Sequence, residues 1–99
     1  FEEALKSVSR AVEINSEIPK FYFNRAIIKY NMKDLDGAMT DLTRILELDE
    51  NYSDALRQRG SLFAELGIVP RACADWKKAS SLGDTRSTHY LQENSEVCK

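Results

Sequence analysis

The chain has few of the residues that catalysis and metal binding require. Its 99 residues include one histidine, His89, and two cysteines, Cys73 and Cys98, and neither type stands in a nucleophile or metal-ligand pattern. The alternating oxygen ligands and central glycine of a calcium loop are also missing. We therefore expect no catalytic residue, no metal site and no cofactor, and we interpret His89 as a surface or interhelical side chain.

Charge and hydropathy argue against two classes of partner. The formal net charge is -2, and the longest basic runs are pairs such as Lys77 and Lys78, so the sequence lacks the basic stretches that bind nucleic acid. No apolar run approaches the roughly 20 residues that a membrane-spanning helix needs. We expect neither nucleic acid nor a membrane as a partner. The chain begins at Phe1, without methionine and inside a helical pattern, so we expect it to be part of a longer protein; bacterial cytoplasm and periplasm both stay open as its compartment.

Apolar side chains recur at the spacing of one helical face, and the pattern returns every 34 residues. Segment 37–49 has apolar residues three and four positions apart, and segments 3–15 and 71–83 match it without a shift of register. The aligned sets are Ala4, Ala38 and Ala72; Val8, Leu42 and Trp76; Ala11, Ile45 and Ala79; and Ile14, Leu48 and Leu82. A constant period of this size is typical of a repeat array.

Three further helical patterns complete the chain. Segments 20–32 and 54–66 lie between the aligned segments and are again 34 residues apart. A last pattern, 85–97, follows Asp84, which is a good residue for the N-cap of a helix. Because no segment alternates apolar and polar residues for long enough to form a strand, the sequence predicts six helices and no sheet.

One pair of helices supplies Tyr22, Ala26, Ala38, Leu42 and Ile45, and the next supplies Leu56, Gly60, Phe63, Ala72, Trp76 and Ala79. At these places the chain resembles the tetratricopeptide repeat family. The resemblance implies an all-α, right-handed superhelical array of antiparallel helix pairs, an α-solenoid, with about two and a half repeats and a C-terminal capping helix. We expect one domain over 1–99. Its parts are the second helix of a truncated repeat (1–18), two repeats (19–52 and 53–84) and the capping helix (85–99).

The resemblance also implies a protein–protein interaction module without catalysis. In this family the first helix of each repeat lines a concave groove that receives an extended peptide or a partner helix. The groove positions correspond here to Lys20, Phe23, Asn24, Ile27 and Asn31 of one repeat and to Asp54, Arg57, Gln58, Ser61 and Glu65 of the next. We expect a protein or peptide as the partner.

Two alternatives to peptide binding stay open. The chain could be a spacer within a longer solenoid that contacts nothing specific. It could also associate weakly with itself, because the truncated first repeat would leave the apolar side of Leu5, Val8 and Val12 exposed.

Acidic chaperone tails are not an expected ligand. Chaperone-binding members of the family hold a terminal carboxylate with asparagine and basic residues, and here Asn24 matches one of these positions. Asp54 and Gln58, however, stand where a lysine and an arginine would be needed. Since Asp54 would repel a carboxylate, we expect no appreciable binding of such tails.

Arginine and aspartate recur at one separation in both repeats. Arg25 precedes Asp41 by 16 residues, and Arg59 precedes Asp75 by the same number. In an antiparallel helix pair with its turn midway between them, the two residues lie opposite each other. The sequence therefore predicts an Arg–Asp ion pair across each helix pair, with the alkyl part of the arginine in the core.

The pairing of the two cysteines is not decided by the sequence. If the last two helices fold antiparallel about Gly83, Cys98 lies about one helical turn from Cys73, within reach of a disulfide. The alternative is two reduced structural thiols, which we favour at this point.

Overall fold

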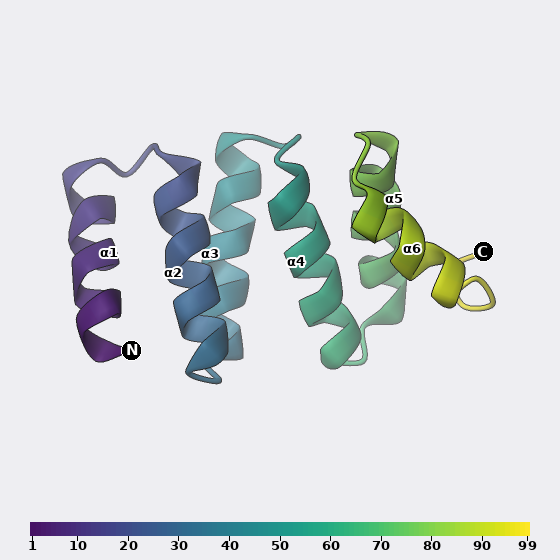
Figure 1. Ribbon diagram of the computed structural model, residues 1–99, viewed down its shortest axis with the longest axis horizontal. Coiled ribbons are helices and arrows are strands. Elements are labelled where there is room, and N and C mark those ends of the chain that lie inside the picture. Colours follow the sequence, from purple (N-terminus) through teal and green to yellow (C-terminus); the bar gives the residue numbers. More distant parts are fainter. The chain divides into compact units, whose positions relative to one another are not determined.

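The computed structural model describes residues 1–99 and contains six α-helices and no strand (Figure 1). The helices are α1 (Glu2–Ile14), α2 (Pro19–Asn31), α3 (Leu35–Leu48), α4 (Ser53–Glu65), α5 (Val69–Ser81) and α6 (Thr85–Glu93). The prediction of six helices is confirmed. Contacts divide the chain into two compact units, Phe1–Glu50 with α1 to α3 and Asn51–Lys99 with α4 to α6. The division falls close to the predicted boundary between the two repeats, and a single domain over 1–99 stays a prediction.

Three helices end in the same left-handed turn. The turn residues are Lys33 after α2 (φ 65°), Gly67 after α4 (φ 78°) and Gly83 after α5 (φ 97°). At each turn the next amide donates a hydrogen bond to the carbonyl five residues before it, at 2.8 to 3.0 Å. This bond satisfies a carbonyl that the helix end would leave unpaired. The chain can therefore reverse within a few residues and begin an antiparallel helix.

Aspartate side chains begin two of the helices. The carboxylate of Asp34 accepts a hydrogen bond from the Gly37 amide at 3.0 Å at the start of α3, and that of Asp84 accepts one from the Ser87 amide at 3.1 Å at the start of α6. Each carboxylate satisfies an amide that has no partner within the helix. The prediction of Asp84 as an N-cap is confirmed.

Each unit has its own apolar core. The core side chains are Val12, Tyr22, Ala26, Ala38, Leu42 and Ile45 in the first unit, and Ala55, Leu56, Leu62, Phe63, Ala72, Cys73, Trp76 and Ala79 in the second. Small residues let the paired helices approach closely. A Cβ on Gly60 would lie 2.6 Å from Nε1 of Trp76, so glycine is the residue that fits where α4 crosses α5.

The predicted ion pairs are present in both units. Nε and Nη2 of Arg25 donate to the carboxylate of Asp41 at 2.9 and 2.8 Å, and Arg59 binds Asp75 in the same way at 2.8 and 2.9 Å. Asp41 also lies 3.2 Å from Nζ of Lys29. The hydrogen bond to Asp41 raises the pKa of Arg25 above its ordinary value, so the pair stays charged. Both predicted pairs are thus confirmed, with two-point geometry.

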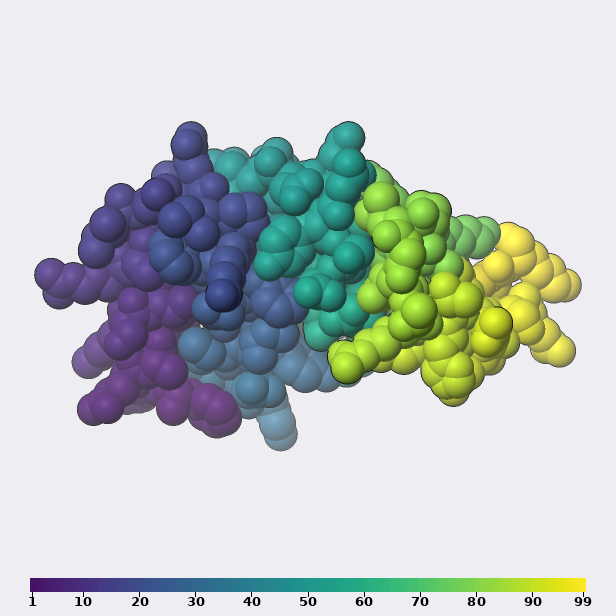
Figure 2. Space-filling model, turned by 45° about the horizontal axis from the view of Figure 1, so that its top comes forward, coloured from purple at the N-terminus to yellow at the C-terminus, as the bar shows by residue number.

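The end of the chain differs from the expectation in two ways. The last helix ends at Glu93 rather than at Val97, and Asn94 closes it by donating from its side chain to the carbonyl of Tyr90 at 2.7 Å. The residues that follow are shown in yellow at the exposed end of the second unit (Figure 2). They turn back towards α5, as the bond from Lys77 to the carbonyl of Lys99 also shows.

The second difference is the disulfide between Cys73 and Cys98, whose Cα atoms are 5.3 Å apart. The preference for reduced thiols is therefore wrong. A helix that continued to residue 97 would run straight on, whereas the turn after Glu93 brings Cys98 to α5. By restricting the unfolded chain, a bond with a sequence separation of 25 contributes about 3 kcal/mol to stability.

We expect Asp41→Asn to lower the free energy of unfolding by about 2 to 3 kcal/mol, because it leaves the guanidinium of Arg25 without its carboxylate in a partly buried site. Urea denaturation of the two proteins measures the difference. Arg25→Leu should also destabilise the chain, since Asp41 is 2% exposed and would keep only Lys29 as a cation.

The matched control is Glu47→Gln, which removes an exposed carboxylate from the same helix. It should change the free energy of unfolding by less than about 0.5 kcal/mol. Equal unfolding midpoints for Asp41→Asn, Arg25→Leu and the wild type would show that the ion pair does not stabilise the fold.

Candidate functional site

The ten predicted groove residues lie on two helices that belong to different units. Helix α2 provides Lys20, Phe23, Asn24, Ile27 and Asn31, and α4 provides Asp54, Arg57, Gln58, Ser61 and Glu65. The two sets are therefore described separately, each with the helices of its own unit. Whether they act as one binding site stays a prediction.

In the first unit, two of the predicted residues line a cavity of about 610 Å³ between α1 and α2. Asn24 is exposed and Ile27 is half-buried. The lining residues are Ala4, Ser7, Val8 and Ala11 of α1 and Phe21, Asn24, Ile27 and Ile28 of α2. None of these eight side chains is charged, so the cavity offers an apolar floor with the Asn24 amide and the Ser7 hydroxyl as its polar groups.

Phe21 and Ile28 are functional candidates that the sequence analysis missed. They share one helical face with Asn24, at separations of three and four residues. The signal was therefore present in the spacing, but the analysis took only the positions implied by the family resemblance. The other three α2 residues of the predicted set, Lys20, Phe23 and Asn31, do not line this cavity.

The first helix is also less exposed than expected. Val12 is only 8% exposed, because α1 packs along α2 (Figure 1). Leu5 and Val8 are half-buried. The expectation that all three form an open apolar side is therefore wrong for Val12, and Val8 is the member of the set that faces the cavity.

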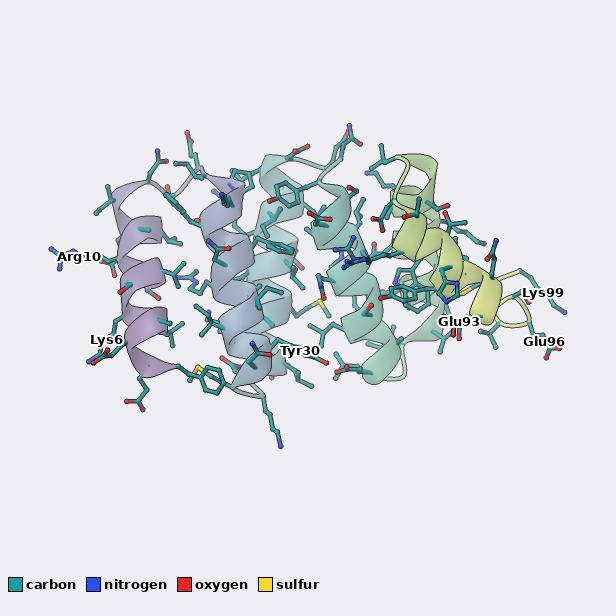
Figure 3. The ribbon with its side chains drawn as sticks, viewed as in Figure 1. Lys6, Arg10, Tyr30, Glu93, Glu96 and Lys99 are labelled. Carbon is teal, nitrogen blue, oxygen red and sulfur yellow. A yellow bond between two sulfur atoms is a disulfide. The ribbon has the colours of Figure 1, made fainter.

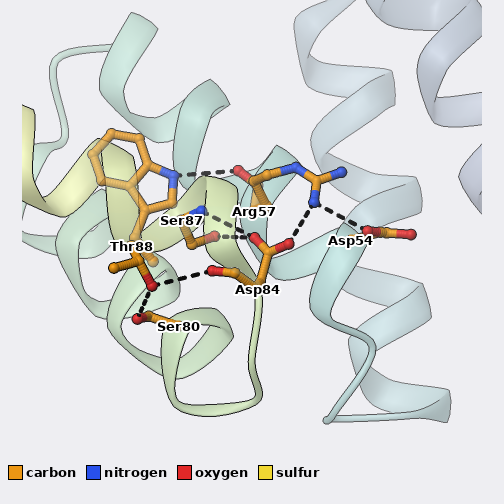
Figure 4. Close-up of polar contacts among 7 residues, drawn as sticks. Asp54, Arg57, Ser80, Asp84, Ser87 and Thr88 are labelled. Atoms are coloured by element: carbon orange, nitrogen blue, oxygen red, sulfur yellow. Dashed lines mark hydrogen bonds and ion pairs between the residues drawn. The ribbon is translucent and has the colours of Figure 1, made fainter.

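In the second unit, the side chain of Arg57 is held by two carboxylates (Figure 4). Its Nη1 donates to Asp84 at 2.8 Å and to Asp54 at 3.1 Å, and the side chain is 10% exposed. Its backbone carbonyl accepts a hydrogen bond from Nε1 of Trp76 at 3.4 Å. Arg57 thus connects α4 to the start of α6.

The interpretation of Arg57 as a ligand-binding side chain is therefore corrected. The guanidinium is buried and already paired, because Asp84 follows α5 and lies against α4. Asp84 is 27 residues further along the chain and has no repeated counterpart that could have indicated the contact. Of the other α4 residues, Asp54 and Glu65 are exposed and Gln58 and Ser61 are half-buried.

Asp84 combines an N-cap with this ion pair. Burial raises the pKa of its carboxyl, but hydrogen bonds from the hydroxyl and amide of Ser87, together with the charge of Arg57, outweigh burial and hold the pKa below 3.8. The carboxylate is therefore stabilised in the folded chain. Thr88 and Ser80 continue the same polar cluster towards the end of α5 (Figure 4).

The remaining polar residues form no further site. His89 is exposed and lies 2.9 Å from Glu93, which confirms its interpretation as a surface side chain. No three His, Cys, Asp or Glu side chains come together in a way that could hold a metal ion. No helix has both the length and the apolar character needed to span a membrane.

Comparisons with known proteins were made by sequence and by structure. No protein-family model matches the sequence. The chain is 28% identical over 101 residues to serine/threonine-protein phosphatase 5 of Rattus norvegicus, an alignment that covers 100% of this chain and 20% of that protein. It is 33% identical over 76 residues to DnaJ homolog subfamily C member 3 of Rattus norvegicus, covering 77% of this chain and 15% of that protein. The chain thus spans about a fifth or less of the length of these relatives.

Solved structures match over nearly the whole chain. The first TPR of Spaghetti (RPAP3), bound to the HSP90 peptide SRMEEVD, superposes with a TM-score of 0.87 at 21% identity and covers 97% of this chain and 78% of that chain. YrrB, a TPR protein with an unusual peptide-binding site, gives a TM-score of 0.82 at 24% identity, covering 93% of this chain and 48% of that chain. The chain has the tetratricopeptide repeat fold. The predicted fold class, antiparallel helix pairs in about two and a half repeats with a capping helix, is confirmed.

We expect Asp84→Asn to destabilise the chain by about 1.5 kcal/mol at neutral pH, because it removes the charge that binds Arg57 and Ser87. The folded pKa lies below 3.8, so this contribution is present above the unfolded value and is lost as pH falls through the folded pKa. Urea denaturation of both proteins at neutral pH and in stronger acid, below pH 3.8, measures the gap. The gap should shrink in acid, and a gap of equal size at both pH values would contradict the assignment.

Proposed function

We propose that this chain is a protein–protein interaction module that binds a segment of a partner protein and performs no catalysis. The observation that carries the proposal is the uncharged cavity between α1 and α2, where Asn24 and Ile27 lie together. The fold adds support, because solved structures of this fold include one bound to an HSP90 peptide and one with a peptide-binding site. Apolar surface with a few polar groups is the usual composition of a peptide-binding surface.

The residues around the cavity favour a ligand of mixed character. Phe21, Ile27 and Ile28 offer apolar area, and the amide of Asn24 can both donate to and accept from a peptide backbone. The absence of a lining charge means that a strongly charged segment would lose water there without gaining an ion pair.

The surface of α4 argues against acidic tails for two reasons. Asp54 has a side chain that is 55% exposed and carries a negative charge towards solvent. Arg57 is the nearby cation, and its guanidinium already binds Asp54 and Asp84. A terminal carboxylate would therefore meet repulsion without an available arginine.

Selection from a random peptide library displayed on phage tests the proposal. We expect the library to yield peptides that bind the wild-type chain and lose at least about tenfold in affinity with the double variant Asn24→Ala/Ile27→Ala, because both residues line the cavity. Thr43→Ala, an exposed residue of α3, is the matched control and should leave affinity unchanged. Calorimetry with SRMEEVD should show no binding.

Each arm has a contrary outcome. A library that yields no binder would favour a spacer and overturn the proposal. Binders that tolerate the double variant at wild-type affinity would move the site away from α2. Micromolar binding of SRMEEVD would refute the exclusion of acidic tails.

A further inference from the structure

Four residues of α1 line the cavity, and all four are in register with buried residues elsewhere. The residues are Ala4, Ser7, Val8 and Ala11. Their counterparts at intervals of 34 residues are Ala38, Asp41, Leu42 and Ile45 in α3, and Ala72, Asp75, Trp76 and Ala79 in α5. All eight counterparts are at most 7% exposed. In α1, by contrast, two of the four residues are exposed and two are half-buried.

The counterparts are buried because the first helix of the same pair covers them. In the first unit α2 covers α3, and Arg25 binds Asp41 across the contact. In the second unit α4 covers α5, with Arg59 bound to Asp75 and Gly60 packed against Trp76. Helix α1 packs along α2 and has no helix in the covering position (Figure 1).

The second unit shows the complete arrangement of three helices. Helices α5 and α6 correspond in register to α1 and α2, and the rings of Trp76 and Tyr90 join them with centroids 5.3 Å apart. Helix α4 contacts both of them, through the pairs of Arg59 with Asp75 and of Arg57 with Asp84. The cavity between α1 and α2 therefore occupies the place that corresponds to α4.

We propose that this cavity is a docking site for one amphipathic α-helix of a partner protein, and that the residue of this helix facing Ser7 is uncharged. The inference names the kind of partner for the proposed function and rests on it, since Asn24 and Ile27 line the same cavity. A helix laid in a groove presents residues three, four and seven positions apart, which is how α2 and α4 cover their own partners.

The uncharged residue follows from the one polar difference between the three second helices. Ser7 stands where Asp41 and Asp75 bind arginine. An arginine in the docked helix would be desolvated there without a carboxylate, and none of the eight lining side chains is charged. The basic residues of α1, Lys6 and Arg10, project away from α2, so they leave the cavity neutral (Figure 3).

The docked helix also has more room at its centre than α4 has. Val8 stands where Trp76 lies against Gly60. Because valine is the smaller side chain, the partner helix needs no glycine at this crossing.

Two synthetic peptides of residues 53–66, with blocked ends, provide the test. One has the α4 sequence with Arg59, and the other has Arg59→Leu. Fluorescence anisotropy with the whole disulfide-bonded chain should show that the Arg59→Leu peptide binds about tenfold more tightly. The variant Ser7→Asp should reverse this order, because it restores a carboxylate opposite the arginine.

Two further variants locate the binding. Ala11→Glu places a charge inside the cavity and should abolish binding of the Arg59→Leu peptide. Arg10→Glu changes the neighbouring residue, which points away from α2, and should leave binding unchanged. Circular dichroism confirms that each variant is folded, and the comparison of the two peptides on the wild type needs no variant at all.

Four results would overturn the inference. The first is no binding of either peptide to the folded wild type, and the second is equal affinity of both peptides for the wild type and for Ser7→Asp. The third is self-association in sedimentation that is lost with Ala11→Glu, which would assign the cavity to a second copy of the chain. The fourth is library-selected peptides that require Ile27 but tolerate Ala11→Glu, which would leave the proposed function standing and remove only the helix.

Discussion

Asp41 lies beneath α2 and binds Arg25 through two parallel hydrogen bonds. The same contact recurs between Arg59 and Asp75, and around both pairs the helices approach closely at small residues such as Ala26 and Gly60. A buried carboxylate is strongly destabilising without its cation, so it allows one register of the two helices. The helix pairing, the apolar cores and the turns between the helices all depend on this register.

The 34-residue period carries most of the fold in local form. Spacing of apolar residues predicted the six helices, and the constant separation of arginine and aspartate predicted both ion pairs, because each follows from residues close in sequence and repeated. The end of α6 and the bond between Cys73 and Cys98 had no such signal, since they depend on how a single segment turns after Glu93. Arg57 was misassigned for the same reason: its partner Asp84 is distant and occurs once.

The candidate site could be predicted in part. Asn24 and Ile27 were named from the family resemblance, whereas Phe21 and Ile28 emerge only when α1 is placed beside α2. The sequence did contain the decisive comparison, which is that Ser7 takes the place of Asp41 and Asp75. Its meaning required the structure, because only there do the α1 residues prove to be uncovered while their counterparts are buried.

The central claim is that α1 carries a face built to be covered by a helix and left open in this chain. Hydrogen exchange of backbone amides tests it directly, since helices with fewer buried contacts open at lower free energy. The account predicts that amides around Val8 exchange faster than those around Leu42, and that the peptide with Arg59→Leu slows the exchange around Val8 selectively. Equal protection of the two helices without peptide, or no change on adding it, would contradict the account.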